Sequence, residues 1–179
     1  MLELFKPTWM VRSIYSVTAE ELKKRGIKAV LVDLDNTLIA WNQPEATEDS
    51  IHWIQTMKKS GIQVMILSNN SGDRIQKVAN ILEVDYVPRS MKPLTRAFKI
   101  AEDKLGLSTN DMVMVGDQLI TDILGANRYN LRTILVKPLL ASDAWNTKLN
   151  RFIELKIMRA LINSDSEMKW RDRLDEPIK

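Results

Sequence analysis

Short apolar runs rich in β-branched residues alternate along this chain with longer stretches of helical periodicity. The runs that predict strands occupy residues 28–33, 62–67, 84–87, 112–116 and 132–136. The stretches that predict helices occupy residues 18–25, 47–59, 72–82, 93–105 and 119–128. Strands that alternate with helices indicate β-α-β units, in which helices cover both faces of a parallel sheet. The pattern therefore predicts an α/β fold.

The chain beyond the last predicted strand has a different pattern. Residues 145–162 predict an amphipathic helix that carries several basic residues, Lys156 and Arg159 among them. Packing of its apolar stripe on the sheet is the favoured interpretation, and contact with a membrane surface is the alternative. Nine of the sixteen residues in 164–179 are charged, which predicts a polar, flexible tail. We therefore expect a domain at 1–163 and a tail at 164–179.

Composition narrows the class of protein. The chain has 179 residues, of which 45% are hydrophobic and 27% charged, as is typical of one globular domain. It has no cysteine and a single histidine, so disulfides, thiolate nucleophiles and iron–sulfur or zinc–thiolate sites are excluded. The net charge of +3 gives only a slight preference for anionic partners. No basic stripe interleaved with aromatic residues indicates nucleic-acid binding.

Charged residues interrupt every apolar stretch before it reaches the ~20 residues that a membrane-spanning helix needs. The start of the chain is apolar in places, but Glu3, Lys6 and Arg12 break it, and no signal-peptide cleavage site follows. We therefore expect a cytoplasmic protein, with peripheral attachment to the inner membrane surface as the alternative.

Two carboxylates follow the first predicted strand at its carboxyl end, where open α/β sheets place their ligands. They are Asp33 and Asp35, in the segment DLDNTL. Further polar residues lie at later strand ends or helix starts, namely Ser68, Lys92, Asp117 and Asp122. Because the carboxyl ends of parallel strands meet at one edge of a sheet, these residues predict one site.

Together these residue types fit phosphoryl transfer through a covalent aspartyl phosphate. Asp33 would be the nucleophile, and Asp35 would protonate the leaving oxygen and then activate water. Ser68 would donate a hydrogen bond to a phosphoryl oxygen, and Lys92 would hold Asp33 and offset negative charge in the transition state. A carboxylate attacks a phosphate only with a cation between the two anions, and oxygen ligands suit Mg²⁺. The expected metal ligands are Asp33, Asp35, Asp117 and Asp122.

Four segments, in order, resemble the motifs of the haloacid dehalogenase superfamily. They are DLDNTL, LSNN, the pair Lys92-Pro93 and GDQLITD, and the resemblance covers residues 28–127. It implies a single Rossmann-like domain with about five parallel strands in the order 3-2-1-4-5. It also implies hydrolysis of a phosphate ester, because family members that lack the acid at Asp35 catalyse other reactions.

The spacing of these motifs leaves no room for a cap domain. Only 33 residues separate Asp35 from Ser68 and 24 separate Ser68 from Lys92, and each interval already holds a helix and a strand. The site should therefore be open to large substrates or covered by a partner. The loop at 39–44 is the expected flap, on which Trp41 would contact substrate or pack on its own domain. Asn69 would orient the phosphate or the flap.

More narrowly, the region from Trp9 through GDQLITDILGANR resembles the YqeG family, cap-less phosphatases of subclass IIIA similar to mitochondrial phosphatidylglycerophosphate phosphatases. The resemblance implies phosphatidylglycerophosphate as substrate, in phosphatidylglycerol synthesis. An open site, an apolar start and a basic last helix agree with a phospholipid at a membrane surface. Two alternatives stay open. One is a phosphatase of another bulky or soluble ester, such as a nucleotide, a nucleic-acid end or a phosphoprotein, and the other is a partner-binding module in ribosome or envelope assembly.

Overall fold

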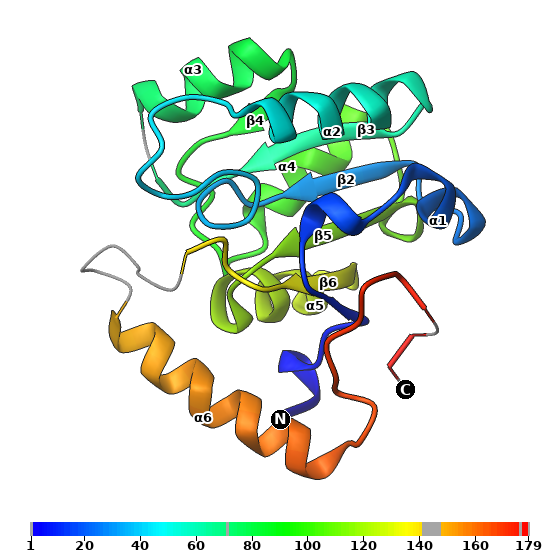
Figure 1. The fold of residues 1–179 in the computed structure, drawn as a ribbon, viewed down its shortest axis with the longest axis vertical. Coiled ribbons are helices and arrows are strands. Elements are labelled where there is room, and N and C mark those ends of the chain that lie inside the picture. The colour runs from blue at the N-terminus through cyan, green and yellow to red at the C-terminus, as the bar shows by residue number, and fades with distance from the viewer. Residues whose placement is uncertain (1, 71, 141–147, 176, 179) are drawn as a thin grey trace.

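The structure, a computed structural model, describes residues 2–70, 72–140, 148–175 and 177–178. These residues form a six-stranded sheet in which every neighbouring pair of strands is parallel (Figure 1). The strands are β1 (Trp9–Val11), β2 (Ala29–Val32), β3 (Gln63–Leu67), β4 (Asp85–Val87), β5 (Met112–Gly116) and β6 (Arg132–Val136). Their order across the sheet is β1-β6-β5-β2-β3-β4.

Helices lie on both faces of this sheet (Figure 1). The α-helices are α1 (Ala19–Lys24), α2 (Glu48–Lys59), α3 (Asp73–Leu82), α4 (Arg96–Leu105), α5 (Leu124–Arg128) and α6 (Lys148–Ser164). Short turns are η1 (Leu2–Phe5), η2 (Ile14–Ser16), η3 (Thr109–Asp111) and the π-helical η4 (Leu119–Ile123). Alternate residues of β2 face opposite layers: Val30 and Val32 join the core beneath α1, α2 and α3, whereas Ala29 and Leu31 join that beneath α4 and α5.

The predicted α/β architecture is confirmed, with one additional strand. Five strands follow the expected order, and β1 is a sixth, beyond the count of about five. The helix expected from residue 93 begins at Arg96, because residues 91–94 first form a turn in which the Leu94 N–H bonds to the Met91 carbonyl. In the described part of the chain, the motif-bearing strands are joined by single helices and loops, and no cap domain stands over the sheet edge.

Strand β1 lies at the edge of the sheet beside β6, with Trp9 paired to Ile134. Its three residues, Trp9, Met10 and Val11, are buried. This part of the apolar start, which the sequence suggested as support for lipid contact, is thus core, whereas Leu2 and Leu4 before it are exposed. Three residues are too few for a periodic signal, and pairing with the distant β6 makes them a strand.

The residues after α6 return along the outer side of β1. The Arg171 N–H bonds to the Met10 carbonyl at 3.1 Å, and its carbonyl accepts the Arg12 N–H at 3.0 Å. Met168 and Leu174 are buried. The described residues of the predicted tail thus lie against the edge of the sheet, and its flexibility stays a prediction. A few apolar side chains spaced among many charged ones find places at the sheet edge, which the charge count alone concealed.

Among the residues of α6 whose side chains are described, 152–164, one face packs on the protein. Leu161 is buried in a cluster with Met10 and Leu135, so the expected packing of this helix against the sheet region is present. Two apolar residues of the predicted stripe, Phe152 and Ile153, are exposed instead. The expected first turn at 145–147 lies outside the described residues. Among the described helices, none has both the length and the apolar character that a bilayer span requires.

Candidate active site

Three aspartates converge at the carboxyl edge of the sheet. Asp33 follows β2 and Asp117 follows β5, and these strands are paired, with the Asp33 N–H bonded to the Val115 carbonyl at 2.9 Å. Asp122 comes from η4, the turn after β5. Carboxylate oxygens of the three residues lie within 4.8 Å of one another. The structure therefore brings together aspartates that the sequence places at separate strand ends.

Gly116 makes room for one of these carboxylates. It ends β5, and a side chain at this position would collide with Asp122. The Asp122 Oδ2 accepts the backbone N–H of Gln118 at 3.1 Å, which holds the carboxylate over the glycine. The segment GDQLITD thus begins with glycine because its own turn folds Asp122 back against the strand end.

Lys92 supplies positive charge at the centre of the cluster. Its Nζ lies 2.8 Å from Asp33 Oδ1 and 2.7 Å from Asp122 Oδ1, and it also donates to the Leu67 carbonyl at 2.7 Å. The side chain is only 1% exposed. A buried ammonium needs anionic or polar partners to offset its desolvation, so Lys92 and the two aspartates hold one another in place.

The cluster carries more negative than positive charge. Burial, opposed in part by Lys92 and reinforced by Asp122 and Asp117, raises the pKa of Asp33 well above its ordinary value. Burial alone would lower the pKa of Lys92, but Asp122 and Asp33 more than compensate, so the pKa is raised and the ammonium stays charged. When ionised, three carboxylates exceed one ammonium by two negative charges.

This donor set fits a divalent metal ion that prefers oxygen. Asp122 Oδ1 is buried, and although it lies close to Lys92 Nζ, no described residue donates a well-aligned hydrogen bond to it. A buried oxygen without an aligned donor, in a cluster with two excess negative charges, is the arrangement that a divalent cation completes. Asp33, Asp117 and Asp122 are the candidate ligands.

Asp35 does not join this cluster. Its Oδ1 pairs with Arg74 Nη1, and its Oδ2 accepts a hydrogen bond from Asn70 Nδ2 at 2.6 Å. The expectation that the Asp35 side chain ligates the metal is therefore not supported. A full positive charge on the neighbouring helix engages this carboxylate instead.

Arg74 also holds the flap. It lies in the first turn of α3, and its Nε donates to the Gln43 carbonyl at 2.9 Å while Nη2 donates to the Ala40 carbonyl at 3.1 Å. One guanidinium thus joins α3, Asp35 and the loop after the nucleophile. The sequence analysis missed Arg74 and Asn70. The signal that could have found them is their place: Asn70 is the last residue of LSNN, and Arg74 lies in the first turn of the helix that follows it.

Ser68 and Asn69 differ in orientation although they are neighbours. Ser68 is buried at the end of β3, and its Oγ accepts the Asn70 N–H at 3.1 Å. The Asn69 amide instead bonds to the backbone of Lys92, with Oδ1 accepting its N–H at 2.8 Å and Nδ2 donating to its carbonyl at 2.9 Å. Since both ends of the amide are engaged, the geometry makes Asn69 a support for Lys92 and does not favour the expected substrate contact.

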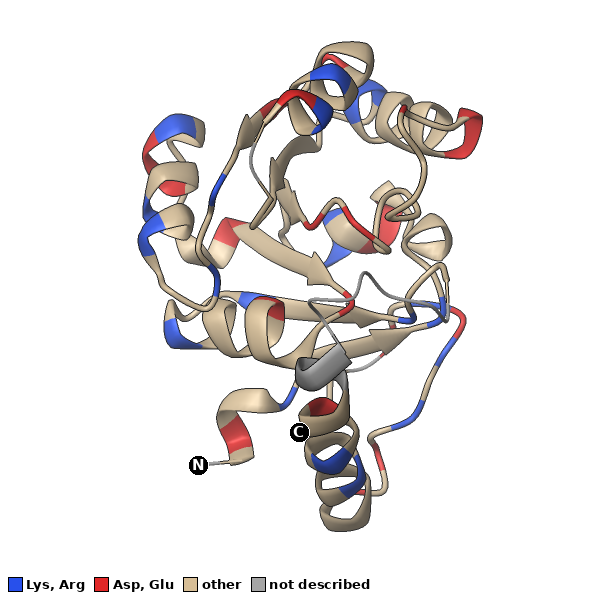
Figure 2. Cartoon of the chain, turned by 90° about the vertical axis from the view of Figure 1, so that its left-hand side faces the viewer, with Lys and Arg blue, Asp and Glu red and all other residues tan. Residues whose placement is uncertain are grey.

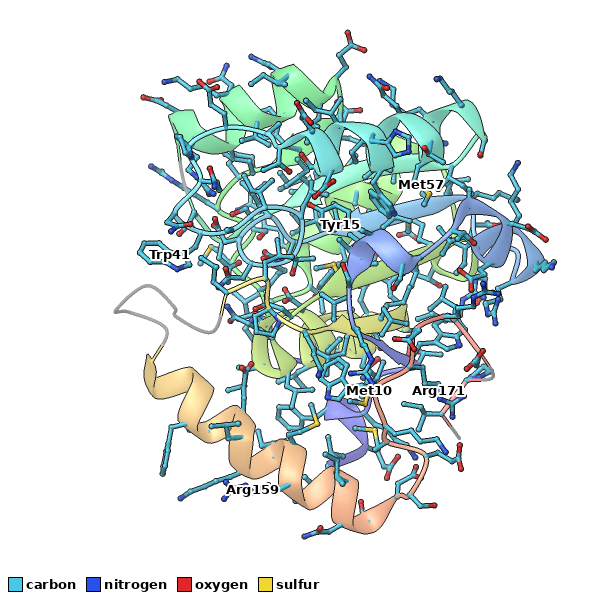
Figure 3. All side chains as sticks on the ribbon, in the orientation of Figure 1. Met10, Tyr15, Trp41, Met57, Arg159 and Arg171 are labelled. Carbon is cyan, nitrogen blue, oxygen red and sulfur yellow. The ribbon has the colours of Figure 1, made fainter. Side chains whose placement is uncertain are left out.

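The flap begins at a left-handed turn. Asn36 has a φ of 63°, a conformation that asparagine tolerates better than most residues. Its Oδ1 accepts the Trp41 N–H at 3.3 Å, which anchors the loop. The Trp41 side chain is 37% exposed and lies at the margin of the molecule on the side where the strands end (Figure 3). It is thus accessible to a substrate at the sheet edge.

A further residue that the sequence analysis missed, Glu154, links α6 to the site. Its side chain is buried, and Oε1 accepts the Ile120 N–H of η4 at 2.9 Å. Because η4 carries Asp122, α6 supports the turn that positions a candidate metal ligand. A single acid in a basic, amphipathic helix gives no signal of this role in the sequence.

Comparisons with known proteins agree with this geometry. The family model described as haloacid dehalogenase-like hydrolase matches residues 2–130. A probable phosphatase, YqeG of Bacillus subtilis, is 39% identical over 95% of this chain and 98% of its own length. Phosphatidylglycerophosphate phosphatase 1 of Arabidopsis thaliana, chloroplastic/mitochondrial, is 29% identical over 86% of this chain, which spans 47% of that protein.

A solved structure shares the fold. It is the cobalt-bound form of the deoxy-D-mannose-octulosonate 8-phosphate phosphatase YrbI from Haemophilus influenzae, with a TM-score of 0.54 and 14% identity. The match covers 82% of this chain and 98% of that one. With the family model, the YqeG relative and the acidic cluster at the sheet edge, the conclusion is that the chain belongs to the haloacid dehalogenase-like hydrolases.

Proposed function

We propose that this haloacid dehalogenase-like phosphatase forms a phosphoaspartate on Asp33, depends on Mg²⁺ and acts on phosphatidylglycerophosphate. The observation that carries the proposal is the setting of Asp33. Its side chain is 13% exposed at the open edge of the sheet, 2.8 Å from the Lys92 ammonium and within the cluster formed with Asp117 and Asp122. A carboxylate that is held by a cation and still reachable from solvent is suited to attack an anionic substrate.

The proposed reaction has two steps on two separate carboxylates. Asp33 forms a bond to phosphorus while the bond from phosphorus to the ester oxygen breaks, and Asp35 gives its proton to that leaving oxygen. Asp35 then takes a proton from water as the water oxygen attacks phosphorus, which releases phosphate and restores Asp33. Arg74 and Asn70 hold the Asp35 carboxyl group outside the acidic cluster, which leaves it to serve as acid and base while the cluster holds Asp33.

The other residues reduce the charge repulsion of the first step. Lys92 offsets negative charge beside Asp33. Ser68 Oγ accepts a bond from Asn70, so its O–H proton can point to a phosphoryl oxygen. A metal ion held by Asp33, Asp117 and Asp122 would supply the remaining positive charge, and an all-oxygen donor set favours Mg²⁺ over softer metals.

Two observations support a phospholipid substrate: the similarity to a phosphatidylglycerophosphate phosphatase and the open shape of the candidate active site. The Arabidopsis relative is a phosphatidylglycerophosphate phosphatase, and the match extends over 86% of this chain. The described structure has no cap domain over the site, and Trp41 stands exposed beside it. We therefore propose that the protein works at the inner membrane surface and that Trp41 contacts the substrate.

The test is phosphate release from phosphatidylglycerophosphate in mixed micelles, beside a panel of soluble phosphate esters, with Mg²⁺ or with EDTA. Asp33→Asn is the inactive variant, and Asp85→Asn, at an exposed aspartate of β4, is its matched control. We expect lipid-selective release that EDTA and Asp33→Asn abolish and Asp85→Asn leaves intact. Release only from soluble esters would reject the lipid substrate. No release from any ester would reject the enzymatic mechanism and favour a partner-binding role.

A further inference from the structure

Exposed large apolar side chains gather in two parts of the described structure. One group lies on α6 and consists of Phe152, Ile153, Leu155 and Ile162. The other lies on loops at the carboxyl edge of the sheet and consists of Trp41, Met91, Leu94 and Leu139, which we call the apolar rim. Other exposed members include Leu2 and Leu4 of η1, a turn that packs against α6, and Ile81 of α3. Most exposed large apolar side chains of the described structure therefore lie on or near α6 or beside the candidate active site.

The outer face of α6 combines apolar and basic groups. Phe152 and Leu155 are 57% and 58% exposed, and Lys156 and Arg159 are exposed with them. Leu155, Lys156 and Arg159 follow Phe152 by three, four and seven residues, so the four positions share one side of the helix. The Lys156 Nζ lies 4.5 Å from the centroid of the Phe152 ring.

The acid of this helix points the other way. Within residues 152–164 the sequence holds one carboxylate, Glu154, and it is buried against η4. Figure 2 shows the described part of α6 with blue bands beyond its single red one. The face that meets solvent is thus apolar and cationic, while the inner face already packs on the protein through Leu161.

We infer that this outer face of α6 docks on membranes that contain anionic lipids. Aromatic and aliphatic side chains enter the boundary between head groups and acyl chains, and Lys and Arg beside them attract anionic head groups. A second copy of the chain is the less suitable occupant, because it would bring Lys156 and Arg159 of two faces together. This inference rests on the proposed function, because docking would bring the enzyme to a substrate that is itself a membrane lipid.

The placement of α6 would turn the active site toward the bilayer. Helix α6 begins on the side of the molecule where the strands of the sheet end (Figure 1), and Trp41 of the apolar rim lies on that side too (Figure 3). A membrane that contacts the start of α6 would therefore lie near the open site. A phosphate ester in a lipid head group would then reach Asp33 without leaving the surface.

Flotation with vesicles tests docking without any substrate. The full chain is mixed with phosphatidylcholine vesicles or with vesicles that contain phosphatidylglycerol, at low and high salt. We expect flotation with the anionic vesicles only. Lys156→Gln with Arg159→Gln should weaken binding by roughly tenfold to thirtyfold, since each basic residue at an anionic surface contributes about fivefold. Phe152→Ser with Leu155→Ser should abolish it.

A matched control lies on α3, at the opposite end of the molecule (Figure 1). Lys77 and Ile81 are an exposed basic and an exposed apolar residue spaced by four, as on α6. Lys77→Gln with Ile81→Ser should leave flotation unchanged. All three double variants should keep wild-type turnover of a soluble ester, because none of these residues contacts the acidic cluster in the described structure.

Three outcomes would overturn the inference: no flotation of the wild-type chain with anionic vesicles, equal loss in the α3 control, or a dimer in light scattering that Phe152→Ser with Leu155→Ser dissociates. Its failure is separable from that of the proposed function. Lipid hydrolysis in micelles without vesicle binding would reject docking alone. Vesicle binding without lipid hydrolysis would leave docking intact and reject the proposed substrate.

Discussion

The carboxyl edge of the sheet and the segment that follows β6 use their charged residues in opposite ways. At the edge, Lys92 and Asp122 are almost fully buried, and Asp33 nearly so. In the described part of the last segment, most charged residues face solvent and apolar ones such as Met168 and Leu174 fill the edge beside β1. Burying charge costs free energy of folding, whereas burying apolar surface contributes it.

Activity should therefore depend mainly on one of these regions and stability mainly on the other. The carboxyl edge holds an arrangement that costs stability and is suited to chemistry. The C-terminal segment adds stability, and Glu154 is the residue through which it reaches the turn that carries Asp122. Substitutions at the edge should therefore reduce activity with little loss of stability, and substitutions in the last segment should do the reverse.

Asp33→Asn should give the largest effect, because it should lower turnover while it raises the melting temperature in the absence of metal. We expect turnover to fall at least about 10³-fold, equivalent to about 4 kcal/mol in the barrier. Without metal, the variant should melt higher than wild type by roughly 2–4 °C for each kcal/mol gained. Thermal melts in EDTA, beside phosphate release with Mg²⁺, check both parts.

The sign of the stability effect follows from the pKa. Because the pKa of Asp33 is raised in the folded state, the ionised carboxylate opposes folding, and stability is lost as the pH rises from the ordinary aspartate pKa through the raised one. Asparagine removes that loss, while Lys92 keeps Asp122 as a partner. A lower melting temperature in EDTA at neutral pH would contradict this account.

Leu174→Ala should show the opposite phenotype. Leu174 is 3% exposed, and its carbonyl accepts a hydrogen bond from Arg25. Truncating a buried leucine costs about 2–4 kcal/mol, so the denaturant midpoint should fall markedly. Turnover per folded molecule should not change. The control is Leu4→Ala, at a leucine that is 43% exposed. Equal midpoints for the two variants would show that the last segment adds no stability.

Arg74→Gln should reduce kcat by roughly tenfold to a hundredfold, with a smaller change in KM, as expected when a positioning group is lost. The reason is that Arg74 joins Asp35 to the flap through the carbonyls of Ala40 and Gln43. Lys77→Gln, an exposed position on the same helix, is the control. If KM rose while kcat stayed constant, Arg74 would be a binding residue instead.

Glu154→Gln should have the smallest effect and should touch both regions. The bond from the Ile120 N–H to Oε1 would lose its charge but not its acceptor, which we expect to cost about 1 kcal/mol. Melting temperature and the Mg²⁺ concentration for half-maximal activity should both shift slightly. Glu167→Gln, at an exposed glutamate, should shift neither. A shift in stability alone would show that α6 does not position Asp122.

Much of the candidate site could be predicted because its residues lie in short segments at strand ends. Asp33 directly follows β2, and Asp117 follows β5, so strand patterns alone place both at one edge. The partners of Asp35 could not be found in this way. Arg74 and Asn70 meet it across 39 and 35 residues, and no periodic pattern encodes such a pairing.

The sequence by itself determined the α/β class, the absence of a cap between the motifs and the meeting of Asp33, Asp117 and Asp122 at one edge, although it added Asp35 to them. These follow from local periodicity and from the rule that parallel strands end at one edge, whereas the order of five strands came from the family resemblance. Only the tertiary structure decided that Trp9–Val11 is a sixth strand, that Leu174 is buried and that α6 has one packed and one open face. Each of these depends on contacts between distant parts of the chain, where the partner surface determines which side chains are buried.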